Sequence, residues 1–204
     1  QVAEGATGDG ERRAALAATI AGCDRATRLV EQLLQLARLE ADMADTRAPD
    51  SRRGQADLAA AAAQQVHELA TQAGRRGQQM ALDRPPHVVA VPMSGPLLAV
   101  LLRNLIDNAL RYGPDGGRVQ VKVLAATADA GAHLVVEDAG PGLSDADLQR
   151  LGERFFRVLG SGQSGSGLGW SIVQRLARLH DLDMALDRSP TLGGLRVTVR
   201  WPLG

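Results

Sequence analysis

Polar side chains recur along one side of an otherwise apolar segment, Leu101–Tyr112. Asn104, Asn108 and Arg111 follow one another in steps of four and three, which return to the same side of a helix. Tyr112 comes directly after them at the end of the segment. Burying an amide without a partner costs about 1–3 kcal/mol. The row therefore indicates either a cavity that holds a polar ligand or a surface helix with a polar stripe.

A carboxylate followed by two glycines stands directly after a predicted strand, in the segment Glu137–Gly142. Asp138 would be a fixed hydrogen-bond acceptor there, and Gly140 and Gly142 leave the neighbouring backbone bare. Such an acceptor can take a hydrogen bond from an exocyclic amine, as on adenine. The alternative is a tight turn that happens to contain an acidic residue.

A third segment, Gly165–Gly169, is rich in glycine and directly precedes a predicted helix. Backbone N–H groups at such a helix start bind anions, and glycine lets phosphates approach closely. The spacing is not the Gly-x-Gly-x-x-Gly of dinucleotide sites, because Trp170 stands at the last position and the segment follows a loop rather than a strand. Either a phosphate-binding loop or a flexible loop without a ligand fits this composition.

Composition excludes several classes of function. The chain has 204 residues, with 23 basic and 23 acidic side chains, which argues against a nucleic-acid binder that uses a general basic field. Lys122 is the only lysine, and no GxxxxGK[ST] phosphate loop is present. A single cysteine, Cys23, fits a reducing compartment. No run is long and apolar enough to span a bilayer, and the chain opens with Gln1, so we expect a piece of something longer.

Two parts differ in their hydrophobic pattern. Residues from about 11 to 42 carry apolar or small side chains in alternating steps of four and three, which favours a helix of a bundle; an ordinary amphipathic helix is the alternative. Residues 42–56 are polar and form the candidate linker. We therefore divide the chain into a partial helical hairpin, 1–48, and a second domain, 49–204.

The second domain alternates helical and strand patterns, which predicts an α/β sandwich with helices on one face of a mixed sheet. Asp57 is the expected cap of the first helix, and Ser94-Gly95-Pro96 the expected start of the second. Expected helices cover residues 58–74, 95–112 and 168–180, and expected strands cover 78–83, 87–91, 119–123, 132–137, 184–187 and 195–201.

The three motifs, in this order within about seventy residues, resemble the nucleotide-binding domain of sensor histidine kinases, in the superfamily shared with gyrase, Hsp90 and MutL. Arg154-Phe155-Phe156-Arg157 resembles the phenylalanine box of these kinases, and residues 31–40 resemble the second helix of their dimerisation hairpin. The pattern is most similar to kinases that pair with OmpR-like response regulators. The resemblance implies a two-layer α/β sandwich that binds ATP and Mg²⁺.

The same resemblance implies roles for individual residues. Asn108 would supply an oxygen to Mg²⁺, Asn104 would position the reaction near the phosphates, Arg111 would contact phosphate, and Tyr112 would pack near the adenine. Asp138 would hold the adenine amine. Residues 143–164 would form a lid over ATP, in which Arg154 or Arg157 reaches the γ-phosphate or is merely solvated. The further nucleotide-binding residues would be Gly140, Gly142, Arg157, Gly165, Gly167, Leu168 and Gly169.

One motif of these kinases is missing, because none of the four histidines is followed by an acidic residue, a basic residue and proline. His133 is expected to be exposed, and Asp181 stands where glycine commonly ends the helix. We therefore expect a fragment that binds ATP but does not phosphorylate itself. Its parent would form a homodimer through the hairpin. We expect the parent to be a protein of the bacterial inner membrane, with this part in the cytoplasm. The alternatives are an ATP hydrolase of the same fold and a degenerate, non-enzymatic binding or dimerisation module.

Overall fold

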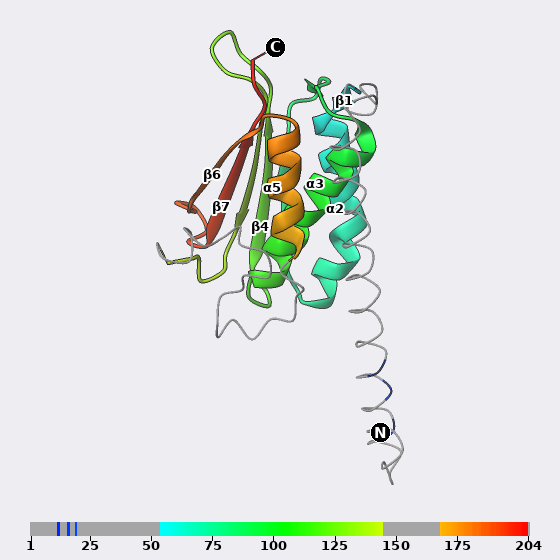
Figure 1. Ribbon diagram of the computed structural model, residues 1–204. Coiled ribbons are helices and arrows are strands. Elements are labelled where there is room, and N and C mark those ends of the chain that lie inside the picture. The colour runs from blue at the N-terminus through cyan, green and yellow to red at the C-terminus, as the bar shows by residue number, and fades with distance from the viewer. Residues whose placement is uncertain (1–11, 13–15, 17–18, 20–53, 145–167, 204) are drawn as a thin grey trace.

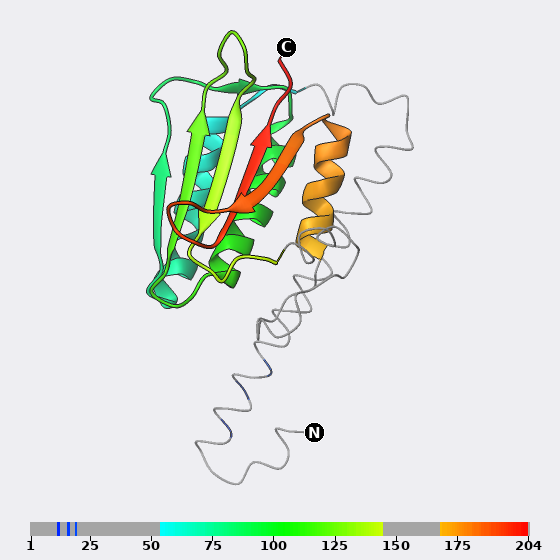
Figure 2. The same cartoon turned by 90° about the vertical axis from the view of Figure 1, so that its left-hand side faces the viewer.

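A computed structural model describes residues 12, 16, 19, 54–144 and 168–203 of the chain. Five strands form a mixed sheet in the order β2-β4-β5-β7-β6, and the helices α2, α3 and α5 cover one of its faces (Figures 1 and 2). This arrangement confirms the predicted two-layer α/β sandwich. The elements are β1 Ala56–Asp57, α2 Leu58–Arg75, β2 Gln79–Asp83, β3 Ala90–Val91, α3 Gly95–Tyr112, β4 Arg118–Leu124, β5 His133–Asp138, α5 Leu168–Leu179, β6 Asp183–Arg188 and β7 Leu195–Arg200.

The sheet is mixed because β2 runs parallel to β4, whereas each of the other neighbouring pairs in it is antiparallel. Strand β4 alternates as predicted: Val119, Val121 and Val123 are buried under the helices, and the residues between them are half-buried. Residues of β5 are buried on both faces or nearly so, because this strand lies in the middle of the sheet. The central position of β5 therefore brings Asp138, its last residue, into the interior.

Helix α3 lies between α2 and α5 and contacts both, as well as strands β4 and β5 (Figure 1). Its bounds match the sequence-based expectation: Pro96 stands in the first turn, and Gly113 follows the last residue. The apolar face is buried almost completely, so the helix is fixed against the sheet along its length. The side chains that fill this interface are Leu98, Leu101, Leu102, Leu105, Ile106 and Leu110.

Asp57 caps helix α2, as predicted, and joins it to the segment before β3. Its Oδ1 accepts hydrogen bonds from the N–H of Ala59 at 2.9 Å and of Val89 at 3.0 Å. Burial raises the pKa of Asp57, but hydrogen bonds from backbone N–H groups and the charge of Arg84 outweigh it, so the pKa lies below its ordinary value. The folded chain therefore favours the ionised form of this carboxyl group.

Three details differ from or refine the sequence-based expectations. The strand predicted at residues 87–91 is only Ala90–Val91, because its partner β1 has two residues before α2 begins. His133, expected to be exposed, is half-buried, because β5 has a neighbour on each side. Asp181 follows α5 with a φ of 51°, the left-handed conformation that glycine commonly adopts and that aspartate tolerates.

Some predictions fall on residues outside the described ranges. Residues 145–164 of the lid, which include the phenylalanine box with Arg157, lie there, as do Gly165 and Gly167. Of the predicted hairpin helix, Arg12, Leu16 and Thr19 are described and are helical. The division into residues 1–48 and 49–204 stays a prediction. Among the described helices, none combines the length and the apolar character needed to cross a membrane.

Replacing Asp57 with alanine is expected to lower the free energy of unfolding at pH 7 by about 0.5–2 kcal/mol, because α2 loses its cap. Since folding lowers the pKa of Asp57, its carboxylate stabilises the fold above the pKa of the unfolded chain, about 3.9, and this contribution disappears as the pH falls through the folded value. Urea unfolding at pH 7 and at about pH 3 measures the difference between parent and variant. We expect it to shrink at the lower pH.

Asp129→Ala is the control for this measurement, because Asp129 is an exposed carboxylate in the loop between β4 and β5. Equal losses in the two variants, or a difference for Asp57→Ala that does not depend on pH, would contradict the assigned cap.

Candidate functional site

The two predicted amides of α3 lie in different surroundings. Asn104 is 8% exposed, and its Nδ2 donates to the carbonyl oxygen of Val100 at 2.8 Å, one turn earlier in the same helix. Asn108 is half-buried, and among the described residues no hydrogen bond reaches its amide. Within the described part of the chain, the carbonyl oxygen of Asn108 has no partner, and such an oxygen is the type of ligand that Mg²⁺ takes together with waters and phosphates.

No group of three or more His, Cys, Asp or Glu side chains that could hold a metal ion occurs in the described ranges. Mg²⁺ takes oxygen ligands and keeps several waters, so one amide oxygen together with phosphate oxygens is a plausible set for it.

Arg111, predicted to contact phosphate, is held by a carboxylate in the structure. Its Nη2 is paired with Oδ2 of Asp107, four residues earlier on α3, and the Arg111 side chain is 18% exposed. Oδ1 of Asp107 also accepts a hydrogen bond from Nε2 of Gln72 at 2.7 Å. Arg111 could therefore reach a phosphate only by sharing or leaving this ion pair.

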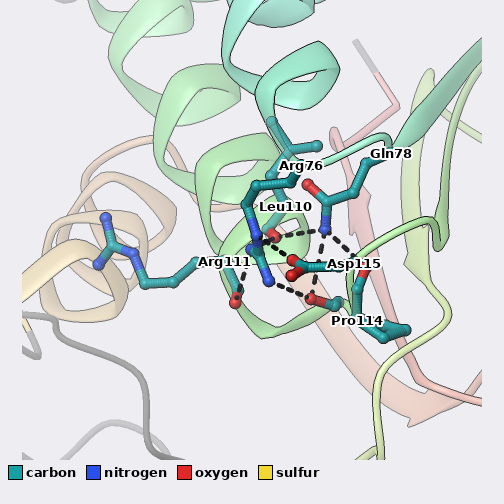
Figure 3. A network of polar contacts seen from close by, with 7 residues as sticks. Arg76, Gln78, Leu110, Arg111, Pro114 and Asp115 are labelled. Carbon is teal, nitrogen blue, oxygen red and sulfur yellow. Dashed lines mark hydrogen bonds and ion pairs between the residues drawn. The ribbon is translucent and has the colours of Figure 1, made fainter.

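The carboxyl end of α3 is held by two side chains from the segment between α2 and β2 (Figure 3). Arg76 donates to the carbonyl oxygens of Leu110 at 2.6 Å, Arg111 at 3.3 Å and Gly113 at 3.0 Å, and its Nε pairs with Asp115. A helix end leaves its last carbonyl groups without partners inside the helix, and its dipole favours a cation there. Arg76 satisfies both requirements at the end that carries Asn108.

Gln78 also caps the end of α3, next to Arg76, as Figure 3 shows. Its Nε2 donates to the carbonyl oxygens of Leu110 at 2.8 Å, Gly113 at 3.2 Å and Pro114 at 3.1 Å. A Cβ atom at Gly113 would lie 2.9 Å from the carbonyl oxygen of Ala109 and 3.3 Å from Nε2 of Gln78. Glycine after the last turn therefore leaves room for the amide to approach the helix end.

Asp138 is 5% exposed at the end of β5. Its Oδ1 accepts hydrogen bonds from the N–H of Gly140 at 2.8 Å and of Leu195 at 3.2 Å. Burial raises the pKa of Asp138, and these two N–H groups counteract the shift only in part. The carboxyl group is thus a buried acceptor whose orientation is fixed by backbone on two sides.

The glycines after Asp138 allow this loop to meet α3. A Cβ atom at Gly140 would lie 2.8 Å from the carbonyl oxygen of Tyr112 and 2.8 Å from Oδ1 of Asp138. Gly142 has a φ of 73°, which favours glycine. The half-buried Tyr112 therefore ends α3 directly beside the loop that follows Asp138, and Asn108 lies one turn before it on the helix.

Helix α5 begins at Leu168, and Gly169 in its first turn is buried. Figures 1 and 2 place the start of α5, the carboxyl end of α3 and the carboxyl end of β5 at the same end of the molecule. Helix N-termini favour anions, which is the property that the sequence-based prediction assigns to this segment. The structure thus brings together the described parts of the three motifs, although they are far apart in the sequence.

A groove of about 620 Å³ lies between α5 and β6, with Trp170, Gln174, Arg178 and Met184 among its lining residues. It contains none of the predicted site residues. Trp170, which directly follows the predicted site residue Gly169, is among the residues that line it.

Several residues that shape the site were missed by sequence reasoning. Arg76 and Gln78 act on carbonyl groups more than 30 residues away, and no local pattern marks such partners. The Arg111–Asp107 pair had a signal, since an acid and a base four residues apart face each other on a helix. Gly194 lies between two predicted strands and carries no further signal in the sequence, yet a Cβ atom there would lie 2.2 Å from Oδ1 of Asp138.

Comparison with known proteins adds to this geometry. A family model described as histidine kinase-, DNA gyrase B-, and HSP90-like ATPase matches residues 94–204. The chain is 38% identical over 190 residues to the sensor protein QseC of Escherichia coli strain K12, an alignment that covers 93% of this chain and 40% of that protein. It is 35% identical over 167 residues to the swarming motility regulation sensor protein RssA of Serratia marcescens, covering 82% and 34% of the two chains.

Among solved structures, the cytoplasmic segment of histidine kinase QseC is similar to this chain with a TM-score of 0.60 and 29% identity, covering 89% of this chain and 95% of that one. The ATP binding domain of PrrB from Mycobacterium tuberculosis is similar with a TM-score of 0.59 and 25% identity, covering 75% and 98%. The chain spans about 40% of the length of the sensor protein QseC that it matches.

Replacing Arg76 with methionine is expected to lower the free energy of unfolding by about 1.5–3 kcal/mol, because carbonyl groups at the end of α3 lose hydrogen bonds to a charged donor. The control is Asp115→Asn, which removes the ion pair but leaves the bonds to the carbonyl groups. It should cost about 0–1 kcal/mol, since the Asp115 side chain is 78% exposed. Urea unfolding measures both variants, and equal losses would show that the cap does not hold α3.

Proposed function

Because the chain belongs to the family of histidine kinase-, DNA gyrase B-, and HSP90-like ATPases, we propose that it is the ATP-binding catalytic part of a two-component sensor histidine kinase. The observation that carries this proposal is that the carboxyl ends of α3 and β5 and the start of α5 lie at one end of the sandwich. Asn108 stands one turn before the end of α3, and Asp138 is the last residue of β5. The similarity to sensor proteins such as QseC supports the kinase among the activities of the family.

In this proposal the nucleotide lies across the end of the sandwich. Asp138 accepts a hydrogen bond from the adenine amine, and Gly140 and Gly142 leave room for the ring beside Tyr112. Asn104 and Asn108 lie at the phosphates, with Gly169 and the residues before it following them. Mg²⁺ bound through Asn108 would neutralise charge on the phosphates, which is the main requirement of phosphoryl transfer.

The reaction would move the γ-phosphoryl group of ATP to a neutral imidazole nitrogen of a histidine. A P–N bond forms, the bond between the γ-phosphorus and the bridging oxygen breaks, and ADP leaves. A response-regulator aspartate, of the OmpR-like type by resemblance, would then accept the phosphoryl group. In the parent protein we expect the hairpin to form a homodimer and this part to face the cytoplasm beneath the inner membrane.

The surroundings of Asp107 argue against a hydrolase. Hydrolysis needs a base that orients water, and Asp107 is the carboxylate on α3 next to Asn108 in the sequence. Both of its oxygens are engaged, Oδ1 by Gln72 and Oδ2 by Arg111. Asn104 is an amide that cannot act as a base, and it donates back to its own helix. The described residues of α3 therefore position a nucleotide but offer no free base.

Asn108→Ala is expected to remove the Mg²⁺-dependent part of nucleotide affinity while the fold survives, because a half-buried amide without a described partner contributes little to stability. We expect a non-hydrolysable ATP analogue to bind at least about tenfold more weakly in the presence of Mg²⁺. Calorimetry with and without Mg²⁺ measures this effect. Gln64→Ala, an exposed amide of α2, is the matched control, and equal affinity of Asn108→Ala and the parent would reject the metal role.

Phosphotransfer in trans tests the proposed activity. The chain is incubated with radiolabelled ATP, Mg²⁺ and a separately produced dimerisation hairpin that carries a phosphoacceptor histidine. We expect an acid-labile label on the hairpin that depends on Asn108. The chain incubated without the hairpin should acquire no such label. Robust release of phosphate without labelling would favour the hydrolase, and failure of the ATP analogue to bind at millimolar concentration would favour a degenerate module.

A further inference from the structure

The turn between β6 and β7 folds back onto the carboxyl end of β5, as Figure 2 shows for the face of the sheet away from the helices. The N–H of Ser189 donates to the carbonyl oxygen of Gly194 at 2.7 Å, and the N–H of Gly193 donates to that of Ser189 at 3.0 Å. These two bonds close the turn. The contacts that Ser189 and Gly194 make with β5 then set the position of the turn relative to this strand.

On the outer face of the sheet, the turn is held by a buried carboxylate. Glu137 is 1% exposed, and its Oε1 accepts a hydrogen bond from the hydroxyl group of Ser189 at 2.9 Å. Its Oε2 accepts from Nζ of Lys122 at 3.1 Å. The Ser189 hydroxyl also accepts from the N–H of Leu192 at 2.9 Å. Ser189 therefore uses its hydroxyl group to tie the inside of the turn to β5.

On the inner face, the same turn meets the next residue of β5. The N–H of Gly194 donates to the carbonyl oxygen of Asp138 at 3.1 Å, and the N–H of Leu195 donates to Oδ1 of Asp138 at 3.2 Å. The fit is close, because a Cβ atom at Gly194 would lie 2.2 Å from that oxygen. The orientation of the Asp138 carboxylate thus depends on where the end of the turn lies.

Glu137 and Asp138 are neighbours in one strand, so their side chains point to opposite faces of the sheet. We propose that the Glu137–Ser189 hydrogen bond fixes the position of the β6–β7 turn and thereby orients the Asp138 carboxylate toward the purine. Ser189 is then a determinant of base selectivity. This inference rests on the proposed function, because it takes Asp138 as the acceptor of the adenine amine. It assigns Glu137 and Ser189 to positioning, not to contact with the nucleotide.

The physical consequence of losing the hydroxyl group is local. Val197 and Val199 are buried in β7 and keep that strand in the sheet. The turn would lose two hydrogen bonds, and the Leu195 N–H would no longer be held against Oδ1 of Asp138. The carboxylate could then rotate, and the acceptor would no longer match the exocyclic amine of adenine.

The test compares the affinities of the 204-residue chain for non-hydrolysable ATP and GTP analogues, measured by competition against a fluorescent nucleotide. We expect the parent to prefer the ATP analogue and Asp138→Asn to lose most of this preference. Ser189→Ala should lower the ratio of the two affinities about three- to tenfold, the range that one or two hydrogen bonds provide. Asp183→Asn is the control, since it breaks an exposed β6–β7 ion pair with Arg200 and leaves the turn intact.

A second pair of variants separates positioning from packing. Glu137→Gln keeps an oxygen that accepts from Ser189 and should keep a ratio near that of the parent. Glu137→Met removes the acceptor and should lower the ratio as Ser189→Ala does. If the Ser189→Ala variant does not fold, Glu137→Met takes its place in the test.

The outcomes distinguish the two proposals. A parent that binds neither analogue, or binds both equally, overturns the proposed function and this inference with it. A parent that prefers the ATP analogue, together with Ser189→Ala and Glu137→Met variants that keep this preference, overturns the inference alone. A lower melting temperature with an unchanged ratio does the same, because it shows a structural role only.

Discussion

The burial of α3 against the sheet determines where the polar side chains of this helix lie. The helix packs its apolar face against the sheet between α2 and α5, so its direction is fixed along its whole length. Interiors are close-packed, and such a helix cannot slide or turn without opening cavities. Asn108 and Tyr112 therefore come to lie in its last turns, where Tyr112 meets the loop that follows β5. The apolar interface positions the chemistry without taking part in it.

A helix that ends in a functional site has an unusual difficulty, because its last carbonyl groups need partners and its negative end repels phosphates. In this chain Arg76 and Gln78 supply these partners from outside the site. The guanidinium of Arg76 also places a positive charge at the negative end of the helix dipole. The last carbonyl groups of α3 are therefore satisfied without using the side chains of its last turn, which the proposed function assigns to the ligand.

Sequence patterns predicted most of the fold, because hydrophobic periodicity and capping are local. The bounds of α3, the cap at Asp57 and the alternation in β4 all follow from neighbouring residues. The order of the motifs predicted the family, which the family match confirms. The surroundings of the site residues followed from local patterns only in part. The four-residue spacing of Asp107 and Arg111 allows their ion pair, whereas Arg76 and Gln78 reach the end of α3 from more than 30 residues away.

The contacts around Asp138 could not be predicted for a different reason. Leu195 lies 57 residues further along the chain, and its N–H reaches Oδ1 only because β7 pairs with β5. A Gly-Gly pair in a turn is common, and nothing in the sequence separates a glycine chosen for its turn from one chosen for closeness to a carboxylate. Gly194 belongs to the second kind, since its neighbour Asp138 leaves no room for a side chain.

Under the proposed function, the burial of Asp138 also affects how tightly the site binds its ligand. Because burial raises the pKa of Asp138, the protonated form favours folding; this contribution is complete below the pKa of the unfolded chain and is lost as the pH rises through the folded value. The N–H groups of Gly140 and Leu195 offset this burial only in part, so ionising Asp138 costs the folded chain free energy. In the proposed complex, an adenine amine that donates to the ionised carboxyl group would offset part of this cost, which couples ligand binding to the stability of the fold.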